Sequence, residues 1–187
     1  MRVFIALLIE EDLREKARRA QEQLKKQLSG ASISWVASQN FHFTLVFLDE
    51  QSPDAVEKIG LALEAAAARL KGFEAKVGGW GAFPNLVRPK TLWIGVESSN
   101  DLLEEIYNVV ELCLQPIGFK GEERGFHAHL TIGRVKGHVG DIAKAFETVD
   151  AHSLGIIKVS ALSLMQSTLQ PQGAEYTEIK RFEIKSE

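Results

Sequence analysis

The alternation of apolar and polar residues divides the chain into strands and amphipathic helices. Alternating patterns or short apolar runs mark the expected strands at 2–9, 32–36, 41–49, 73–83, 91–96, 126–135, 156–169 and 176–184. Apolar residues recur at every third or fourth position in the expected helices at 10–29, 53–70, 100–116 and 142–149. This mixture of elements predicts a protein of the α+β class.

Local signals mark where several of these elements begin and end. Ser52 followed by Pro53 combines a capping side chain with a proline at the first helical position. Asn100 is expected to cap the third helix in the same way. Polar loops that contain glycine or proline are predicted at 84–90, 118–125 and 171–173, the last as the turn of a closing hairpin.

The order of elements repeats once along the chain. Strand, helix, strand, helix and strand occupy residues 2–83 and recur in 91–169. This period is far longer than that of stacked repeats, so it indicates a single internal duplication. We expect one domain, residues 1–187, built as two lobes about a pseudo-two-fold axis. Each lobe would contain an antiparallel or mixed sheet with helices on its outer side.

Composition narrows the class of protein. The chain of 187 residues has a net charge of −3, which excludes a general polyanion binder. One cysteine excludes an internal disulfide and fits a reducing compartment. The apolar run 3–9 is too short for a signal peptide, and no stretch is long enough to span a membrane. We therefore expect a monomeric cytoplasmic protein that is not bound to a membrane.

Two short polar pairs interrupt otherwise apolar strands. His42 and Thr44 are two residues apart, as are His129 and Thr131, so each pair shares one face of its strand. The apolar residues between and after them, Phe47 included, are expected on the opposite face. Packing about the pseudo-two-fold axis would bring the two polar pairs face to face.

Facing histidines supply a proton donor and a proton acceptor near neutral pH. Hydrolysis of a phosphodiester needs both, because water loses a proton as it attacks phosphorus and the departing oxygen gains one. The threonine hydroxyls can donate hydrogen bonds to the non-bridging oxygens, where negative charge accumulates. A cyclic phosphate is already strained, so the pattern favours its hydrolysis without a metal or another cofactor.

The two motifs and their flanks resemble the signatures of the two-histidine phosphoesterase superfamily. More narrowly, the chain resembles the RNA 2′,3′-cyclic phosphodiesterases, also called the 2′-5′ RNA ligase family, with their repeated His-x-Thr-x motif. One difference is Ala128, where the family usually has a proline before the second histidine. The resemblance covers nearly the whole chain and rests on the segments 2–6, 35–36, 42–48, 83–85, 92–96, 129–134 and 173–176.

The resemblance implies a bilobal fold with both histidines in a central cleft. It implies an enzyme that opens the 2′,3′-cyclic phosphate of RNA ends, tRNA fragments among them, to a 2′-phosphate, with weak reverse 2′-5′ ligation. His42 would be the proton donor to the leaving 3′ oxygen, and His129 would be the proton acceptor from water. Thr44 and Thr131 would hold the phosphate, and Arg134 would contact it.

Three further residues are candidates for binding the substrate. His127 shares the face of His129 and is expected at the rim of the cleft. Phe83 and Phe126 are the aromatic residues that we expect to stack on a base. Arg134 has the opposite parity to His129 in an ideal strand, so only a bulge or the end of the strand would turn it toward the same face.

Alternative functions are compatible with the same residues. The substrate could be a small cyclic nucleotide or a 2′-5′ oligoadenylate. A non-catalytic RNA-binding module could share the fold. A zinc hydrolase could use His42, His127 and His129 as its metal ligands.

Overall fold

The computed structural model describes residues 1–119, 125–170 and 173–185, in which strands and helices alternate irregularly. Short 3₁₀ turns occur at Ser38–Asn40 and Gln115–Ile117. The bounds of the other elements are β1 (Arg2–Leu8), α1 (Glu11–Gln27), β2 (Ile33–Trp35), β3 (His42–Glu50), α2 (Pro53–Ala67), β4 (Phe73–Phe83), β5 (Thr91–Val96), α3 (Asn100–Leu114), β6 (Leu130–Val135), α4 (Ile142–Thr148), β7 (Gly155–Val159), β8 (Ala161–Gln170) and β9 (Gly173–Glu183).

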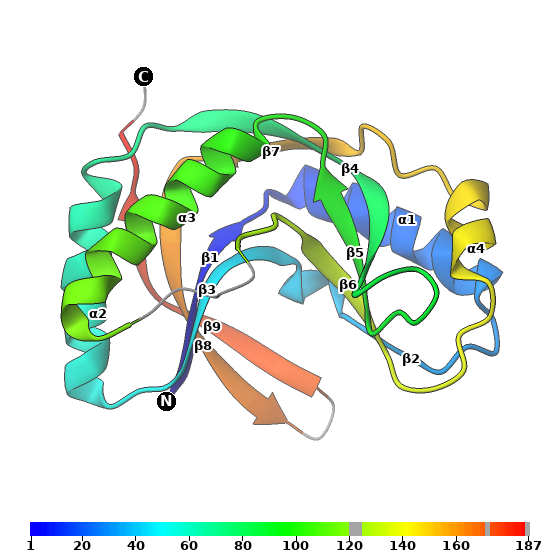
Figure 1. Ribbon diagram of the computed structural model, residues 1–187, viewed down its shortest axis with the longest axis horizontal. Helices are drawn as coiled ribbons and strands as arrows, with labels where there is room; N and C mark the ends of the chain where they lie inside the picture. The colour runs from blue at the N-terminus through cyan, green and yellow to red at the C-terminus, as the bar shows by residue number, and fades with distance from the viewer. Residues whose placement is uncertain (120–124, 171–172, 186–187) are drawn as a thin grey trace.

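The strands form a sheet whose order is symmetric about its centre (Figure 1). From edge to edge the order is β7-β4-β5-β6-β3-β1-β8-β9, with β2 paired to β6, and neighbouring strands are antiparallel. On one side of the centre, β6, β5 and β4 occupy the positions that β3, β1 and β8 occupy on the other. The α+β class is confirmed, and this order agrees with two lobes related by a pseudo-two-fold axis.

The sheet differs from the prediction, because the two lobes do not have separate sheets. β3 and β6 meet at a single residue pair, Phe43 opposite Leu130, which joins the strands of both lobes. These residues follow the two motif histidines, and they are 1% and 0% exposed. Burial of both apolar side chains in a shared core brings the two backbones together, which sequence periodicity alone does not reveal.

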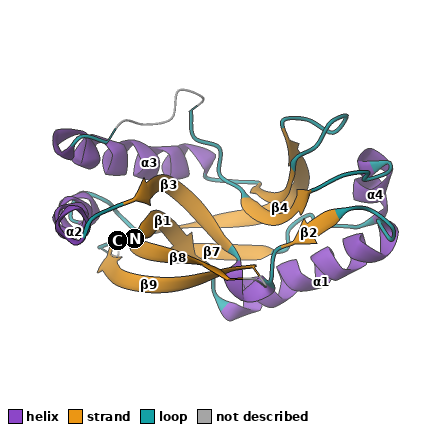
Figure 2. Cartoon of the chain, turned by 90° about the horizontal axis from the view of Figure 1, so that it is seen from below, coloured by secondary structure: helices purple, strands orange, loops and turns teal. Residues whose placement is uncertain are grey.

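Helices from both halves of the chain cover each lobe (Figure 2). α2 and α3 pack together on the lobe of β1, β3 and β8, whereas α1 and α4 lie on the lobe of β4, β5 and β6. α1 belongs to the first half of the sequence but packs against β7 of the second lobe, where Leu13 lies close to Gly155. The two halves therefore exchange helices, which ties both sides of the sheet to one core.

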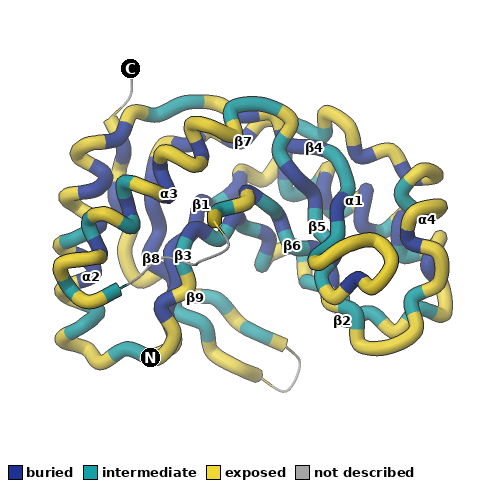
Figure 3. The backbone as a smooth tube through the Cα atoms, in the orientation of Figure 1, coloured by how far each residue is buried: buried dark blue, intermediate teal, exposed yellow. Residues whose placement is uncertain are grey.

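A buried polar side chain holds α1 against the centre of the sheet. Gln21 Nε2 donates hydrogen bonds to the carbonyl oxygens of Val36 (2.8 Å) and Ile132 (2.7 Å). These bonds fix the part of β6 that follows Thr131. Figure 3 shows the buried positions along the strands and on the inner sides of the helices. The predicted apolar stripe of α1 is confirmed by the burial of Leu13, Ala17, Ala20 and Leu24.

The helix starts agree with the local signals except at α3. Ser52 Oγ accepts a hydrogen bond from the backbone N–H of Ala55 at 3.2 Å, as predicted for the start of α2. Asn100 does not cap α3, because Ser99 takes that position with a left-handed φ of 61°. The Asn100 side chain donates instead to the Val96 carbonyl oxygen at 3.2 Å. The sharp turn at Ser99 moves Asn100 into the first turn of the helix.

Two predicted strands are divided or shortened. The stretch 156–169 breaks at Ser160, so β7 pairs with β4 in one lobe and β8 pairs with β1 and β9 in the other. The stretch 126–135 joins the ladder only from Leu130 onward, so His129 precedes the strand. Residues 120–124 and 171–172, which belong to two of the predicted loops, lie outside the described residues. In the described ranges, no helix combines the length and the hydrophobicity that crossing a membrane requires.

Candidate active site

The two histidine motifs meet in a cleft at the junction of β3 and β6. The cleft has a volume of about 410 Å³, and side chains from both lobes line it. It therefore contains residues that are far apart in the sequence. The predicted site residues in its lining are His42, Thr44, Phe83, His129, Thr131 and Arg134.

The register of the junction sets each histidine across from the threonine of the other motif. Phe43 and Leu130 are opposite each other in an antiparallel pair, so His42 lies across from Thr131, and the other two motif residues are related in the same way. Because Phe43 and Leu130 point into the core, their neighbours point into the cleft. Opposite side chains in such a pair start about 5 Å apart at Cβ. The four polar groups thus surround a space suited to one phosphate.

The same local hydrogen bond orients both imidazoles. His42 Nδ1 lies 2.8 Å from the Asn40 carbonyl oxygen, and His129 Nδ1 lies 2.7 Å from the His127 carbonyl oxygen. A carbonyl oxygen can only accept, so each Nδ1 carries a proton, and Nε2 is the atom that gains or loses one. Thr44 Oγ1 lies 3.0 Å from His42 Nε2, so the hydroxyl donates to the neutral ring.

Aromatic rings bury His42 on two sides. The centroid of its ring lies 4.9 Å from that of Phe4 and 5.2 Å from that of Tyr176, which approaches edge-on. Burial lowers the pKa of His42 from its ordinary value of 6.5 to about 4, although the hydrogen bond to the backbone raises it. Repulsion from the Arg134 guanidinium, and from His129 whenever that ring is protonated, lowers this pKa further. The imidazole is therefore neutral at pH 7 in the free protein.

This lowered pKa makes the stability of the protein depend on pH. The unfolded chain binds a proton at His42 below pH 6.5, whereas the folded protein does so only near pH 4. Protonation therefore favours the unfolded state, and the free energy of unfolding falls as the pH falls between these two values. The complete loss amounts to about 3 kcal/mol. We expect the free energy of unfolding, measured in urea near neutral pH and near pH 4, to fall less for His42→Gln than for the wild type.

The control for this experiment is His152→Gln, because the His152 side chain is 83% exposed. That variant should lose stability with falling pH as the wild type does. Equal losses in all three proteins would contradict the burial of His42 as the cause.

A β-bulge turns Arg134 into the cleft. Two consecutive residues of β5 pair with Gly133 and Thr131, so Ile132 is an extra residue on β6. Ile132 and Gly133 are both buried although they are neighbours, which shifts the alternation of faces by one residue. Arg134 thereby returns to the side of Thr131 and lines the cleft. This is the kind of bulge that the parity of Arg134 required.

Bulges in β3 overturn the expectation for Phe47. The pairing of β3 with β1 shifts register at Leu45 and again at Leu48, and each shift adds one residue to β3. Phe47 consequently leaves the core side, is 59% exposed and lines the cleft. Leu48 is buried in its place. Phe47 is therefore a further aromatic side chain that a substrate in the cleft can contact.

The three other predicted substrate contacts divide between two pockets. Phe83 lines the cleft, and its ring meets that of His129 edge-on at 4.9 Å. Phe126 instead stacks on Tyr107 of α3 at 5.0 Å, and both Phe126 and His127 line a neighbouring pocket of about 370 Å³. Neither residue lines the cleft itself, although the His127 ring meets that of Phe83 edge-on at 5.4 Å, and contact of either residue with a substrate stays a prediction. The segment that contains them has left the sheet, so strand alternation does not apply to it.

The zinc alternative requires three histidines around one point. His42 and His129 line the cleft, but the His127 ring lines the neighbouring pocket and lies 4.9 Å from the Trp93 ring. Across the described ranges, no group of three His, Cys, Asp or Glu side chains is arranged to hold a metal ion. The ligand set considered for zinc is therefore not assembled.

Sequence reasoning missed residues that position His42. The Asn40 carbonyl oxygen accepts from its ring, and the Asn40 side-chain amide donates to the Ala174 carbonyl oxygen at 2.7 Å. Tyr176 contacts the same ring from β9. The segment 173–176 carried part of the family resemblance, which was the one signal that could have indicated these contacts. The other polar residues of the lining are Arg2, Asp49, Thr91 and Ser167.

Comparison with known proteins relates the chain to named phosphodiesterases. Residues 7–93 match the family described as LigT like Phosphoesterase. The chain is 34% identical to the RNA 2′,3′-cyclic phosphodiesterase of Archaeoglobus fulgidus, over 98% of this chain and 100% of that protein. It is also 34% identical to the protein of the same name from Thermotoga maritima, over 94% of this chain and 91% of the relative.

Solved structures share the fold. A crystal structure of a protein from Thermus thermophilus superposes with a TM-score of 0.81 at 21% identity and covers 100% of both chains. Escherichia coli LigT, complexed with 3′-AMP, gives a TM-score of 0.78 at 22% identity, over 98% of this chain and 97% of that one. At these identities the likeness establishes the arrangement of strands and helices.

Proposed function

This chain belongs to the RNA 2′,3′-cyclic phosphodiesterase family of LigT-like phosphoesterases, and we propose that it hydrolyses the 2′,3′-cyclic phosphate of RNA ends to a 2′-phosphomonoester. One observation carries the proposal. His42 and His129 line one cleft, and each donates from Nδ1 to a backbone carbonyl, so Nε2 is the ring nitrogen that can gain or lose a proton. An acid and a base on opposite sides of one phosphorus atom are what this hydrolysis requires.

In the proposed reaction, His129 Nε2 takes a proton from water while the water oxygen forms a bond to phosphorus. The bond between phosphorus and the 3′ oxygen breaks, and His42 Nε2–H gives its proton to that oxygen. The product carries a 2′-phosphate and a 3′ hydroxyl. Both rings return to their starting states by exchanging protons with solvent, so no step passes through a metal ion.

Three side chains are proposed to hold the phosphate. Thr44 and Thr131 would donate from their hydroxyls to the non-bridging oxygens, and Arg134 would offer its guanidinium to the same group. All three line the cleft beside the histidines. Negative charge grows on these oxygens as water attacks, so the contacts are stronger in the transition state than in the bound substrate.

The low pKa of His42 is compatible with proton donation once an anion is bound. A ring with a pKa of about 4 is a strong acid when protonated, but it seldom holds a proton at neutral pH. A phosphate within hydrogen-bond distance raises the pKa, because its negative charge favours the imidazolium. Substrate binding is therefore coupled to uptake of the proton that His42 later gives to the 3′ oxygen.

Identification of the product tests the proposed function. With a 5′-labelled RNA oligonucleotide that ends in a 2′,3′-cyclic phosphate, we expect a product that carries only a 2′-phosphate. Addition of a chelator should leave the rate unchanged, because both proton transfers use side chains of this chain. A 3′-phosphate product, or binding without turnover as in a non-catalytic RNA-binding module, would contradict the proposal. Loss of turnover with the chelator would contradict the metal-free mechanism separately.

We further propose that residues 1–187 act as one catalytic unit and as a monomer. The cleft takes residues from both lobes of one chain, and the lobes exchange helices, which supports this interpretation. The proposed substrates include tRNA fragments with cyclic phosphate ends, and weak 2′-5′ ligation would be the reverse of the same chemistry. The single cysteine supports a cytoplasmic location.

A further inference from the structure

The cleft opens onto a polar strip of the sheet that extends beyond the phosphate site. We propose that this strip binds the phosphodiester backbone of the RNA that precedes the terminal nucleotide, an inference that rests on the proposed function. The strip runs from the cleft along the end of β6, between β2 and the loop that joins β4 to β5 (Figure 1). The β6 shelf, as we call it, consists of Ser32, Ser34, Lys90, Thr91, Arg134 and Lys136.

The register of β2 and β6 places the side chains of four of these residues on one face, namely those of Ser32, Ser34, Arg134 and Lys136. Ser34 pairs with Arg134, and the N–H of Lys136 donates to the Ser32 carbonyl oxygen at 2.7 Å, so the ladder continues past the end of β6. All four residues are exposed. Ile33, which alternates with the two serines, packs against the core. The face that presents Arg134 to the cleft therefore continues to Lys136, over a length of roughly 3 Å per residue.

The neighbouring strand supplies the other edge of the shelf. Thr91 pairs with Arg134 and lines the cleft, and the Lys90 carbonyl oxygen accepts from the N–H of Val135 at 2.9 Å. Lys90 is exposed. Its loop is held by Asn85, whose side-chain oxygen accepts from the backbone N–H of Arg88 at 2.9 Å. The Lys90 side chain thus starts from backbone that is fixed beside β6.

The distribution of carboxylates singles out this part of the molecule. The three segments that contain the shelf and both motifs, 31–48, 75–96 and 125–140, include five of the 22 Lys and Arg residues. None of the 25 Asp and Glu residues falls in them, although they make up almost a third of the chain. In a protein of net charge −3, the β6 shelf therefore carries three cations and no carboxylate, whereas the carboxylate in the lining of the cleft is Asp49 of β3.

The ion pairs of the protein also support the assignment of the β6 shelf as a phosphate-binding surface. On α1, Arg14, Lys16 and Lys25 each form an ion pair with a neighbouring carboxylate. Lys90 and Lys136 have no such partner among the residues that the structure describes. Ammonium groups without a carboxylate partner, next to serine and threonine hydroxyls, are donors suited to phosphate oxygens.

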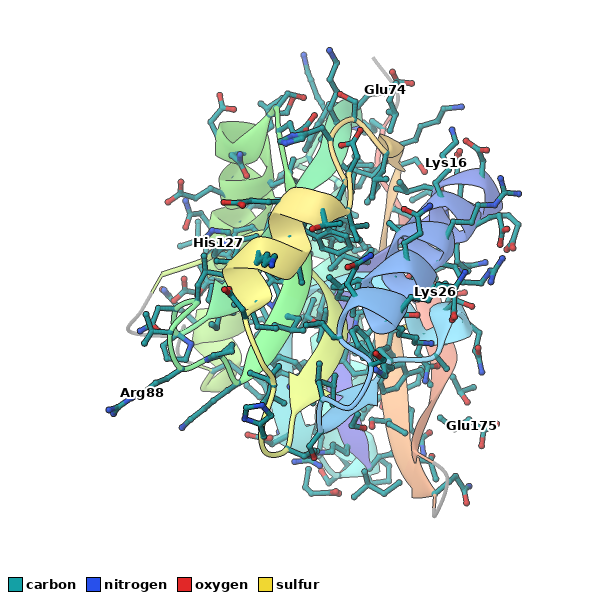
Figure 4. All side chains as sticks on the ribbon, turned by 90° about the vertical axis from the view of Figure 1, so that its right-hand side faces the viewer. Lys16, Lys26, Glu74, Arg88, His127 and Glu175 are labelled. Carbon is teal, nitrogen blue, oxygen red and sulfur yellow. The ribbon has the colours of Figure 1, made fainter. Side chains whose placement is uncertain are left out.

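The opposite wall of the cleft favours the same direction for the RNA. Figure 4 shows Arg88 and Glu175 projecting from opposite sides of the lower half of the molecule. Glu175 belongs to β9, and the hairpin of β8 and β9 contributes the exposed Leu169 to the cleft. A polyanionic strand that leaves the phosphate site is therefore attracted toward the β6 shelf and away from this hairpin.

Substrate length and salt dependence test the shelf together. We expect kcat/KM to be higher for an RNA oligonucleotide with a 2′,3′-cyclic phosphate end than for adenosine 2′,3′-cyclic phosphate, and to fall more steeply with salt. Lys90→Gln and Lys136→Gln should each lower kcat/KM for the oligonucleotide about fivefold at 0.1 M salt, as loss of one phosphate contact to a single strand predicts. Neither change should affect turnover of the mononucleotide.

The matched control is Lys58→Gln on α2, an exposed lysine on the other lobe. It removes the same charge and should leave both substrates unaffected. The shelf is refuted if Lys58→Gln has the same effect as the shelf variants, if the shelf variants change both substrates equally, or if they change neither. If the wild type hydrolyses neither substrate, the proposed function itself fails, and the shelf fails with it.

Discussion

Replacement of either motif histidine by alanine is expected to lower kcat for an RNA cyclic phosphate end by about 10²–10⁴-fold, because each ring performs one proton transfer. His42→Ala removes the donor to the 3′ oxygen, and His129→Ala removes the acceptor from water. The rate of product formation from a 5′-labelled oligonucleotide measures both effects. KM should change much less, since the threonines and Arg134 still hold the phosphate.

The control for the histidine variants is His152→Ala. The His152 ring is exposed and contacts Glu97 outside the cleft. It should retain the activity of the wild type. The double variant His42→Ala/His129→Ala should be little slower than the slower single variant, because the two rings act on one reaction step. Activity that survives in either single variant at the level of the wild type would exclude the two-histidine mechanism.

Replacement of Arg134 by alanine is expected to lower kcat/KM by about 10²-fold, as loss of one charged donor to the reacting phosphate predicts. Arg134→Lys should recover part of this loss, because an ammonium keeps the charge without the two-pronged hydrogen-bond geometry. Steady-state kinetics on the oligonucleotide and on the mononucleotide should give the same ratio of variant to wild type, since both substrates carry the reacting phosphate.

The exposed Arg69, which follows the end of α2, provides the matched control, and Arg69→Ala should leave kcat/KM unchanged. A normal kcat/KM for Arg134→Ala would mean that Arg134 takes no part in catalysis, although the bulge in β6 turns its side chain into the cleft. A loss confined to the oligonucleotide would instead assign Arg134 to the β6 shelf alone.

The polar pairs in the sequence were sufficient to identify the centre of the site. His42 and Thr44 share a face because strand alternation is a local rule, and the β3 strand obeys it as far as Thr44. The same rule fails at Phe47 and at Arg134, where bulges add residues to one strand of a pair. A bulge depends on the partner strand, so the periodicity of one strand cannot reveal it.

The long-range organisation was only partly predictable. The repeated order of elements indicated two related lobes, and the symmetric strand order agrees with it. It did not indicate that α1 would pack against β7, or that one residue pair would join the lobes, because both depend on tertiary contacts. The stacking of Phe126 on Tyr107 of α3 was not predictable for the same reason.

The central claim is that His42 and His129 bind one phosphate between them. Its most direct test is a titration of the protein, labelled with ¹⁵N at histidine, with inorganic phosphate, followed through the Nε2 resonances and assigned with His42→Gln and His129→Gln. We expect both resonances to shift with one dissociation constant and the pKa of His42 to rise on binding. Shifts at only one ring, or two different dissociation constants, would contradict the central claim.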